Sequence, residues 1–492
     1  MPDPTHASPS RAFATALYKA AVEGAAPFPR TRDAVRAWMA VHPTAIASGT
    51  RLHVIALGKA ASAMTAGAAD ALFERDISIT SGVVVTSHQP AISELGPRGT
   101  LPWAVEVHIG DHPVPGPASL NAADAIDDAV RNVEPNDVVF VLVSGGTTSL
   151  AAAPTAALSQ RVGDAGRAQA HIANLAQTLL ESGLAIHEMN AIRRRVLRWG
   201  AGRLAVALHA RGAAHIAVFA ISDVIGDAPE VIGSGPCSPE PLDDTTFFAL
   251  VDAHDLRSSL ERDMAQFLGV QGGDAPPLVP PVNHPAFAAV SYQYVARNRD
   301  AVESLANAAR TAGAQHVTIE DMPLEGDAAE LGEAIARRAL HMAATLPRHE
   351  RAVWVTGGEP VVHLRQMVDR ALTEDEADGT PDEPMKGGRM QALALSAAMR
   401  LEERARDVDD FAWRITLLAA GTDGRDGPTD AAGAIVDCGT PLNARRRGRR
   451  RPDRDLVTGR SWFSLDAAGD LLRTGPTGTN VMDVVAVVVD SR

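Results

Sequence analysis

The sequence is poor in cysteine, in aromatic residues and in long apolar runs. Its two cysteines, Cys237 and Cys438, are too few for a disulfide framework or a four-cysteine zinc site, so we expect a reducing, cytoplasmic setting. Aromatic residues make up 4% of the 492 residues, against 46% hydrophobic residues, which indicates a close-packed core of small side chains. No apolar run approaches the roughly 18 residues of a membrane span. The N-terminus lacks the apolar segment of a secretory signal, and we expect a soluble protein with no membrane partner.

An excess of positive charge is also missing. The formal net charge of −14 argues against a nucleic-acid partner, because such binding depends on Lys and Arg that neutralise phosphates. Two charged tracts, "TEDEADGTPDEPMKGG" and "NARRRGRRRPDR", have too few apolar residues to bury and are predicted to be exposed loops. The basic tract, residues 443–454, could bind anions, although a solvated loop is the simpler interpretation. The sequence leaves the oligomeric state open, a homo-oligomer included.

Two nucleotide-binding fingerprints are absent as well. No G-x-x-x-x-G-K-[ST] loop is present, which excludes an ordinary P-loop enzyme. No G-x-G-x-x-G follows a strand-like run, which argues against a nicotinamide site. The remaining candidates are glycine-bearing turns that follow the apolar runs.

The sequence does contain a regular alternation of short apolar runs with helix-like stretches. Apolar runs of the N-terminal half begin at Leu52, Gly82, Ala104, Asp137 and His215. Continuous runs of this length suit strands that are buried on both faces. Helical patterns such as 118–130 and 188–204 separate them, which predicts βαβ units and a largely parallel sheet.

A proline-rich segment, "GGDAPPLVPPVNHP", divides the chain. Residues 272–285 fit neither a helix nor a central strand, and we interpret them as a linker. The N-terminal domain, residues 1–271, is then predicted to be a Rossmann-like α/β/α sandwich. The same alternation resumes in a C-terminal domain of residues 286–492, with helices near 295–312 and 328–345. The predicted fold class is α/β, with two α/β domains and largely parallel sheets.

Several turns at predicted strand ends carry chemistry, and ligands of open α/β sheets bind beyond the carboxyl ends of the strands. Two glycine turns stand at such ends: Ser144, Gly145, Gly146 and Thr147 in "VLVSGGTTSL", and Gly357, Gly358 and Glu359 in "VTGGE". Glycines let backbone N–H groups approach an anion, and a following helix N-terminus favours negative charge. A tight turn without a ligand explains either motif alone equally well.

Charged residues accompany these turns. Lys59 follows Gly58 at the end of the first strand, and Arg389 follows two glycines in "KGGRMQ"; each could neutralise a phosphate or carboxylate, or simply face water. Asp223 and Asp227 in "ISDVIGD" could hold Mg²⁺ together with substrate phosphates, although turn capping explains either one alone. Together, anion-binding backbone, cations and carboxylates are what phosphoryl transfer needs.

The acidic stretch "GTDGRDGPTDAAGA", residues 421–434, follows the apolar run "WRITLLAA". A simple turn needs far fewer glycines and aspartates. Its position predicts a site wall at the carboxyl edge of the second sheet. Asp423, Asp426 and Asp430 could hold Mg²⁺, order the loop or contact substrate hydroxyls.

The order of these motifs resembles that of the glycerate 2-kinases with a C-terminal MOFRL domain, some of which are named hydroxypyruvate reductase. The resemblance runs from about residue 10 to the C-terminus. It rests on "GKA" at 58–60, "DHPVP" at 111–115, "SGG" at 144–146, "E-x-N-x-x-R" at 188–193, "SDVIGD…VIGSGP" at 222–236, "GGE" at 357–359, "GGR" at 387–389, "GTDGRDGPTDAAGA" at 421–434 and "TGPTGTNVMD" at 474–483.

The resemblance implies ATP-dependent phosphorylation of D-glycerate on its 2-hydroxyl, with Mg²⁺ and a site in the cleft between two α/β domains. The family's conserved lysine and arginine match Lys59 and Arg389, and Asp223 is the candidate for holding Mg²⁺ or positioning the attacking hydroxyl. The other implied contacts are Ser144, Gly145, Gly146, Thr147, Gly357, Gly358 and Glu359 for the cofactor, and Asn190, Arg193, Asp423, Asp426 and Asp430 for glycerate or a related hydroxy acid.

The chain departs from the family's pattern at five positions. They are Thr147 in place of a glycine, Arg195 in place of a His, Gly200 in place of a Lys, Met390 in place of an Asn and Ala392 in place of a Glu. These changes motivate an alternative, a non-catalytic metabolite-binding member. A further alternative, an NAD(P)H hydroxypyruvate reductase, would need a dinucleotide site for which the sequence has no fingerprint.

Overall fold

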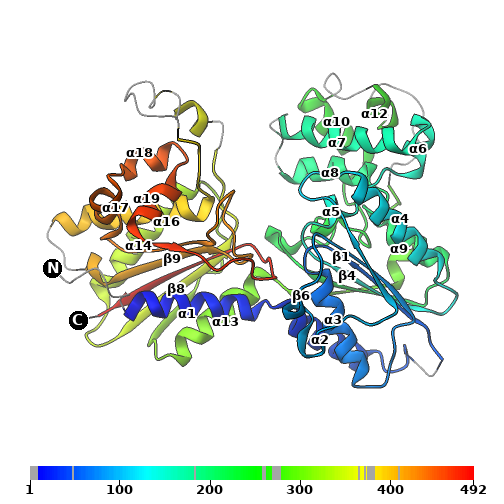
Figure 1. Ribbon diagram of the computed structural model, residues 1–492, viewed down its shortest axis with the longest axis horizontal. Coiled ribbons are helices and arrows are strands. Elements are labelled where there is room, and N and C mark those ends of the chain that lie inside the picture. Colours follow the sequence, from blue (N-terminus) through cyan, green and yellow to red (C-terminus); the bar gives the residue numbers. More distant parts are fainter. Residues whose placement is uncertain are drawn as a thin grey trace. The chain divides into compact units, whose positions relative to one another are not determined.

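The chain folds into two compact units, each a sheet with helices on both faces (Figure 1). Residues 27–296 form what we call the parallel-sheet unit, and residues up to 26 join those from 297 onward in the mixed-sheet unit. The structure is a computed structural model, and it describes residues 9–46, 49–181, 184, 186–256, 262–268, 279–363, 366–370, 373, 383–407 and 411–491.

The parallel-sheet unit contains six strands in the order β3-β2-β1-β4-β5-β6, and every neighbouring pair is parallel. The strands are β1 (Leu52–Leu57), β2 (Ser81–Thr86), β3 (Val105–Ile109), β4 (Val138–Val143), β5 (His215–Ile221) and β6 (Val290–Ala296). The central strands β1 and β4 are buried along their whole length, because helices cover both faces and leave no polar side to the sheet. The predicted Rossmann-like sandwich is confirmed here.

Helices cover the two faces of this sheet in pairs. α2 (Pro27–Val41) and α3 (Ala61–Phe73) lie on one face, where Trp38 packs edge-on against Phe140 of β4. α4 (Pro117–Arg131) and α9 (Arg203–Ala210) lie on the other, where Ile126 and Leu204 share a core with alternate residues of β1 and β4. The sequence predicts one helix over 188–204, whereas the structure ends α8 (Ile186–Val196) before α9, with Gly202 left-handed at the break.

A group of helices forms a second core on the parallel-sheet unit (Figure 1). Its members besides α8 are α6 (Ala156–Val162), α7 (Ala165–Glu181), α10 (Asp244–Ala253) and α12 (Arg262–Phe267). Leu175, Ile192 and Phe247 are among the residues buried at its centre. These helices belong to the crossover connections between β4 and β5 and between β5 and β6, so they extend the fold without adding strands.

The mixed-sheet unit also has six strands, in the order β11-β10-β9-β12-β8-β7. They are β7 (His316–Ile319), β8 (Arg351–Gly358), β9 (Ile415–Gly421), β10 (Gly433–Val436), β11 (Leu471–Leu472) and β12 (Asp483–Asp490). Only β7 and β8 pair in parallel, so the prediction of a largely parallel sheet is wrong for this unit. Parallel neighbours need a long crossover, usually a helix. The connection from β9 to β10, residues 422–432, contains none.

Helices again cover both faces of this sheet. α14 (Ala328–Thr345) and α16 (Arg389–Asp407) pack on one face, and α1 (Pro9–Gly24) and α13 (Asn298–Thr311) pack on the other. Three short helices pack against α16: α17 (Thr440–Gly448), α18 (Pro452–Val457) and α19 (Ser461–Ala468).

The basic tract, residues 443–454, is exposed over much of its length, as its composition predicts, but it is largely helical rather than a loop. It covers the end of α17, the connection 449–451 and the start of α18, and two of its arginines are held by carboxylates. Arg445 pairs with Glu402 at 2.6 Å, and Arg450 pairs with Asp455 at 2.6 Å and Glu383 at 2.9 Å. The fold therefore gives these two arginines partners, Glu402 of α16 among them, that the sequence alone does not reveal. Of the acidic tract, residues 374–382 lie outside the described residues.

The compact units differ from the division expected at residues 272–285. The N-terminal helix α1 packs on α13, and Gly24 has no room for a side chain because a Cβ there would lie 2.0 Å from Oγ of Ser304. Arg11 of α1 also pairs with Asp437 and Asp470. At the other end, β6 completes the parallel sheet, so that unit extends to residue 296. Residues 272–278 of the expected linker lie outside the described residues.

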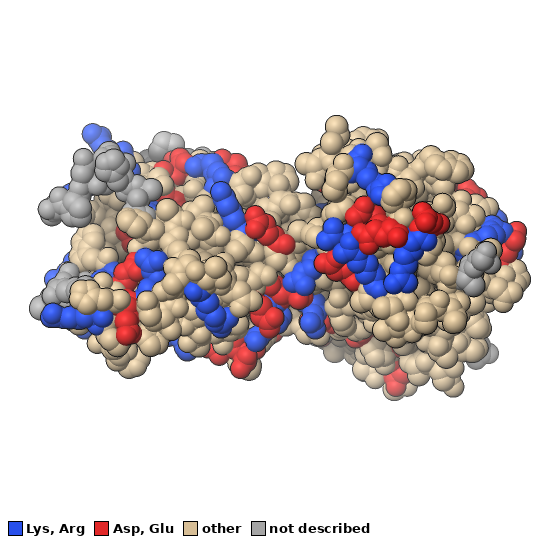
Figure 2. Space-filling view, turned by 90° about the horizontal axis from the view of Figure 1, so that it is seen from below, with Lys and Arg blue, Asp and Glu red and all other residues tan. Residues whose placement is uncertain are grey.

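The surface of α2 and α3 carries charges of both signs. Arg36 pairs with Asp33 and Glu74, and Asp70 pairs with Arg32 and Arg98. On the face drawn in Figure 2, basic and acidic side chains are interleaved rather than separated. Exposed pairs of this kind add little to stability, because water screens their charges. Within the described residues, no helix has both the length and the apolar character of a membrane span.

Candidate functional site

Two of the predicted loops meet where the parallel sheet reverses its strand order. β1 has β2 on one side and β4 on the other, and ligands of such sheets bind beyond the carboxyl ends of strands at this point. Lys59 follows β1 and Gly145 follows β4, and the backbone N–H of Lys59 donates a hydrogen bond of 2.9 Å to the Gly145 carbonyl. The motifs "GKA" and "SGG", 84 residues apart in sequence, are thus one structural feature.

The Ser144 hydroxyl orders these loops. It accepts a hydrogen bond of 3.1 Å from the Ala60 N–H and donates one of 3.3 Å to the Leu57 carbonyl. Gly58 has a φ of +115°, and a Cβ there would lie 2.3 Å from Ser144 Oγ. Only glycine fits this position. Ser144 was expected to cradle an anion, but its side chain is engaged within the protein.

The turn from Gly145 to Thr147 can bind an anion through its backbone. Among the described residues, no acceptor is present for the N–H groups of Gly145 and Gly146, and Gly145 is buried. A buried N–H group such as that of Gly145 normally finds a partner, and the half-buried Gly146 beside it also has none, so the two are suited to a ligand. The helix that follows, α5 (Thr147–Leu150), is only four residues long, and the buried Thr147 hydroxyl closes the turn by donating to the Ser144 carbonyl at 2.8 Å.

The side chains of Lys59 and His112 both lie close to Gly146. A Cβ added to Gly146 would lie 3.4 Å from both Lys59 Cε and His112 Cδ2. The Lys59 side chain is exposed, and no ion pair joins it to any described residue. Partial burial and then the charge of Lys59 lower the pKa of His112, so its imidazole is neutral at pH 7. His112 belongs to the "DHPVP" motif, to which the sequence analysis assigned no role.

Asp223 follows β5, the neighbour of β4, and lies against the same turn. A Cβ on Gly145 would be only 2.1 Å from Oδ2 of Asp223, so this glycine is required by the carboxylate beside it. No group of three His, Cys, Asp or Glu side chains suited to a metal exists among the described residues. A Mg²⁺ ion here would therefore depend on Asp223 together with phosphate oxygens of a bound nucleotide.

Asn190 and Arg193 lie on α8 in the helical group and are both half-buried. Burial lowers the pKa of Arg193, and its Nε is fully buried with no hydrogen-bond partner among the described residues. A buried guanidinium without a counter-charge is costly unless an anion joins it. The turn around Ser234 contacts both α8 and α5, and its hydroxyl lies 2.7 Å from that of Thr148. This turn links α8 to the "SGG" loop.

Two of the sequence departures have structural explanations in this unit. Arg195 is completely buried, donates to the Leu242 carbonyl at 2.6 Å and lies 4.2 Å over the ring of Phe247. A Cβ added to Gly200 would lie 3.2 Å from the carbonyl oxygen of Arg194. Both replacements therefore serve the packing of the helical group.

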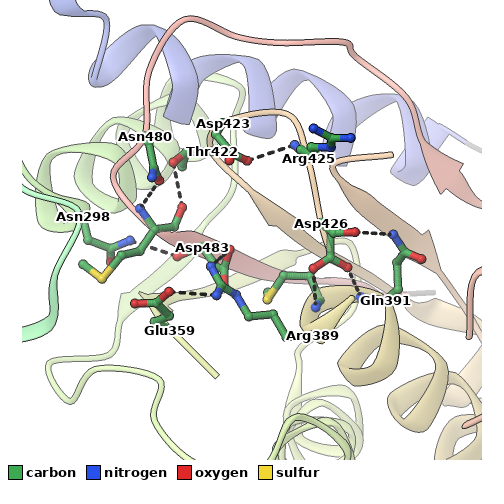
Figure 3. A network of polar contacts seen from close by, with 12 residues as sticks. Asn298, Glu359, Arg389, Gln391, Thr422, Asp423, Arg425, Asp426, Asn480 and Asp483 are labelled. Carbon is green, nitrogen blue, oxygen red and sulfur yellow. Dashed lines mark hydrogen bonds and ion pairs between the residues drawn. The ribbon is translucent and has the colours of Figure 1, made fainter. Parts of the chain in front are cut away.

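In the mixed-sheet unit, Arg389 begins α16 and is held by two carboxylates (Figure 3). Its Nε lies 2.5 Å from Oδ2 of Asp483, and its Nη1 lies 2.8 Å from Oε1 of Glu359. Burial raises the pKa of Asp483, and the guanidinium opposes that rise. Asp483 is the last residue of the motif "TGPTGTNVMD". That motif was the only feature of the sequence that pointed to Asp483, and no role was predicted for it. One cation faces two carboxylates, so Arg389 is largely neutralised within the protein.

The two glycines before Glu359 are explained by close packing. A Cβ on Gly357 would lie 2.0 Å from Oδ1 of Asn298, and one on Gly358 would lie 2.4 Å from the backbone nitrogen of Leu324. Asn298 in turn donates 2.7 Å and 2.9 Å hydrogen bonds to the carbonyls of Val481 and Asp483. The structure therefore gives "GGE" the character of a packed turn rather than an open anion loop.

Asp426, from the acidic stretch, lies inside the protein and caps α16. It is 3% exposed and accepts hydrogen bonds from the N–H groups of Met390, at 3.2 Å, and Gln391, at 2.8 Å. A Cβ on Gly388 would lie 2.2 Å from Asp426 Cγ, which explains the second glycine of "GGR". Burial raises the pKa of Asp426 to about 6, against the opposing effect of the two N–H groups. The motifs at 387–389 and 421–434 thus meet at the start of α16, where the second supplies the cap for the first turn of the helix.

The other two aspartates of this stretch point elsewhere. Asp423 is half-buried, and its Oδ1 accepts a hydrogen bond of 2.9 Å from the Arg425 N–H. Asp430 is exposed and bonds at 2.8 Å to Arg473 and to the indole of Trp462, and these bonds lower its pKa to about 2. The structure does not bring Asp423, Asp426 and Asp430 together on one face, because the loop turns the second inward and the third outward (Figure 3 shows the first two).

The departures at Met390 and Ala392 lie in the apolar core of the mixed-sheet unit. Met390 is 0% and Ala392 is 4% exposed. Both pack in the cluster that joins α14 and α16 to the sheet. Apolar residues therefore suit these positions in this chain.

The fold and the loops together define a class of protein. The chain is a two-unit α/β protein whose six-stranded parallel sheet places an exposed lysine and a turn with two unpartnered N–H groups at its switch point. Such a point is where α/β proteins bind phosphate-bearing ligands.

Comparisons with known proteins agree with this class. A family model described as a domain of unknown function, DUF4147, matches residues 13–269, and the MOFRL family model matches residues 352–483. A relative from Agrobacterium vitis that bears the name of a hydroxypyruvate reductase is 34% identical, over 89% of this chain and 87% of its own. A glycerate 2-kinase from Pyrococcus horikoshii is 30% identical, over 90% and 88%. The crystal structure of glycerate kinase from Thermotoga maritima matches with a TM-score of 0.73 at 26% identity, over 97% of this chain and 99% of that one.

The chain therefore belongs to the glycerate 2-kinase family with a C-terminal MOFRL domain.

Proposed function

We propose that this chain is a kinase that transfers the terminal phosphoryl group of ATP to the 2-hydroxyl of D-glycerate. The names of the Pyrococcus and Thermotoga relatives support glycerate as the acceptor. The observation that carries the proposal is Lys59, an exposed ammonium with no ion pair to a described residue, beside the unpartnered N–H groups of Gly145 and Gly146. Phosphoryl transfer depends mainly on positioning and on neutralising charge, and these groups supply both.

The backbone N–H groups of the turn and the ammonium of Lys59 have different roles in this proposal. The N–H groups of Gly145 and Gly146 hold phosphate oxygens, because adjacent backbone donors without acceptors are pre-organised for an anion. The Lys59 side chain lies against Gly146, and its ammonium neutralises charge that develops on the transferred phosphoryl group. Asp223, which lies against Gly145, would hold Mg²⁺. When bound, that ion neutralises charge on the phosphates of the nucleotide.

Arg193 is the best candidate for the carboxylate of glycerate. It is half-buried, and its pKa is lowered by burial rather than raised by a neighbouring carboxylate. A guanidinium can take a carboxylate with two parallel hydrogen bonds. Asn190, one helical turn before it, supplies an amide for a hydroxyl. Arg389, by contrast, is neutralised by Asp483 and Glu359, and we propose that it positions these carboxylates and the start of α16.

A reductase is the second candidate, because the Agrobacterium relative bears that name and the strand order of the parallel sheet also occurs in dinucleotide-binding proteins. A G-x-G-x-x-G turn that began at Gly58 would need glycines at Ala60 and Ala63. Both positions carry a side chain. The loop after β1 therefore favours a phosphate-neutralising role over a dinucleotide site.

A direct assay separates these functions. The purified chain is incubated with ATP, Mg²⁺ and a panel of hydroxy acids, and ADP release is measured while ³¹P NMR distinguishes the 2- and 3-phosphate of glycerate. Production of 2-phosphoglycerate supports the proposal. NADH oxidation with hydroxypyruvate and no ADP release would support the reductase. Binding of glycerate or ATP without either turnover would support the non-catalytic alternative.

Lys59→Ala tests the residue that carries the proposal. We expect kcat/KM to fall by at least about 100-fold with an unchanged melting temperature, because the side chain is exposed and its charge acts on the transferred group. Lys19→Ala is the matched control, since Lys19 is an exposed lysine on α1 and one of only three lysines in the chain. Full activity of Lys59→Ala would contradict the assignment.

A further inference from the structure

The histidine of the "DHPVP" motif has no role in the function as proposed so far. His112 follows β3, which is the edge strand of the parallel sheet, yet its ring reaches the turn that follows β4. Its Cδ2 and Lys59 Cε are each 3.4 Å from the position of a Cβ on Gly146. Nε2 is bonded to Cδ2, so the ring presents this nitrogen close to the phosphate-binding turn. No hydrogen bond joins the ring to any described residue.

The loop that carries His112 is held firmly in this position. The Asp111 N–H donates to the Ser119 hydroxyl at 3.0 Å, and the Ser119 N–H donates to the Asp111 carboxylate at 3.1 Å. A Cβ on Gly110 would lie 2.1 Å from the Leu150 carbonyl, so the loop packs directly against the end of α5. These contacts fix the backbone of the loop, and the exposed imidazole of His112 lies beside Gly146.

The charges around the ring favour its neutral form. Lys59, from the loop after β1, is the charged group that acts on it directly, and both partial burial and this charge lower the pKa of His112. Asp111 of its own loop is bonded to Ser119, and Asp223 lies on Gly145. A neutral imidazole with no donor or acceptor partner can take up a proton.

We propose that His112 is the general base of the phosphoryl transfer and accepts the proton of the attacking hydroxyl at Nε2. This inference rests on the proposed kinase function. The hydroxyl O–H bond breaks as its proton passes to Nε2, and the oxygen forms a bond to the terminal phosphorus of the nucleoside triphosphate. The bond from that phosphorus to the bridging oxygen breaks, and its electron pair stays on the nucleoside diphosphate. Lys59 neutralises the transferred group while His112 carries the proton.

The position of His112 separates its role from that of the two other candidates near the turn. Asp223 lies under Gly145, where a carboxylate suits a metal ion rather than a proton. Lys59 is a cation and cannot accept a proton while it neutralises phosphate. His112 places its ring carbon Cδ2 beside Gly146 of this turn.

The test compares His112→Asn and His112→Gln with the wild type, with His316→Asn as control. Each amide retains hydrogen bonding but cannot take the proton, so we expect kcat to fall about 100- to 10,000-fold while KM for ATP stays within about twofold. In the wild type, kcat/KM should fall as pH drops through the pKa of His112, and this acidic limb should be lost in both variants. His316 is exposed on the edge strand β7 and pairs with Glu350, so its variant should keep wild-type kcat and the acidic limb.

The outcomes separate this inference from the function on which it rests. A wild-type chain without turnover on any hydroxy acid would refute the kinase function itself. A wild-type kinase whose His112 variants keep kcat, or change only KM, would overturn the base assignment alone. Circular dichroism verifies that the variants fold, which the exposure of His112 leads us to expect. Loss of kcat with the acidic limb intact would also contradict the proposal, because another group would then take the proton.

Discussion

Replacing Asp426 with alanine should weaken the start of α16, although Asp426 follows Gln391 of that helix by 35 positions in the sequence. The Asp426 carboxylate is the acceptor for the N–H groups of Met390 and Gln391, and both of these residues are 0% exposed. Water cannot replace the carboxylate at that depth. Each buried donor left without a partner costs about 1–3 kcal/mol, so the free energy of unfolding should fall by about 2–5 kcal/mol.

Asp426→Asn adds a test of ionisation. The asparagine keeps one acceptor oxygen, so its cost should be about half as large. The folded pKa of Asp426 is raised from 3.8 to about 6, so the folded protein holds a proton that the unfolded chain releases. Its contribution to stability is thus present below pH 3.8 and is lost as pH rises through about 6. A shift of this size corresponds to about 3 kcal/mol, and the stability gap between wild type and Asp426→Asn should narrow by up to that amount between pH 4 and pH 7.

Hydrogen exchange gives the most direct measurement of this prediction. The amides of Met390 and Gln391 should lose protection in Asp426→Ala, and urea unfolding should give the change in free energy. Asp430→Ala is the control from the same loop, since Asp430 is exposed and its ion pair contributes about 0–1 kcal/mol. Unchanged protection of these two amides in Asp426→Ala would refute the capping role. An Asn variant whose stability gap widens with pH would refute the raised pKa.

Two further substitutions test contacts that the sequence does not reveal. Tyr18→Phe removes the buried hydrogen bond of 2.9 Å to the Gly421 carbonyl. The free energy of unfolding should fall by about 1–3 kcal/mol, which a lower melting temperature would show. An unchanged melting temperature would mean that α1 does not support the acidic stretch. Arg194→Met leaves Glu240 buried without its partner and should cost about 3–5 kcal/mol in urea unfolding. Adding Glu240→Gln should recover much of that loss, and an equally unstable double variant would contradict the ion-pair explanation.

The candidate site was only partly accessible to sequence reasoning. Lys59 and the "SGG" turn were predicted as separate anion-binding loops, and β1 and β4 bring them together because their carboxyl ends are neighbours at the switch point. The sequence showed His112 only as one residue of the "DHPVP" motif. No pattern in the neighbouring sequence indicates that the loop after β3 reaches Gly146. The Asp426 contact was equally hidden, because the cap and the helix it serves come from separate segments.

By itself, the sequence determined the features that depend on local pattern. Apolar runs predicted β1, β4, β5 and β12, the spacing of apolar residues predicted α14 over Ala328–Thr345, and the glycine turns marked the ends of strands. Periodicity records which residues face a core, and this information lies within a few turns of chain. It also identified the family, because motif order is a property of the sequence alone.

Tertiary structure decided the features that depend on partners distant in the chain. It made the second sheet mostly antiparallel, moved α1 to the mixed-sheet unit and gave Arg445 and Arg450 their carboxylates. It also turned three similar aspartates into a buried cap, a half-buried turn residue and a surface ion pair. The energy of a charge or a donor depends on burial and on the group it meets, and only the folded chain brings those groups together.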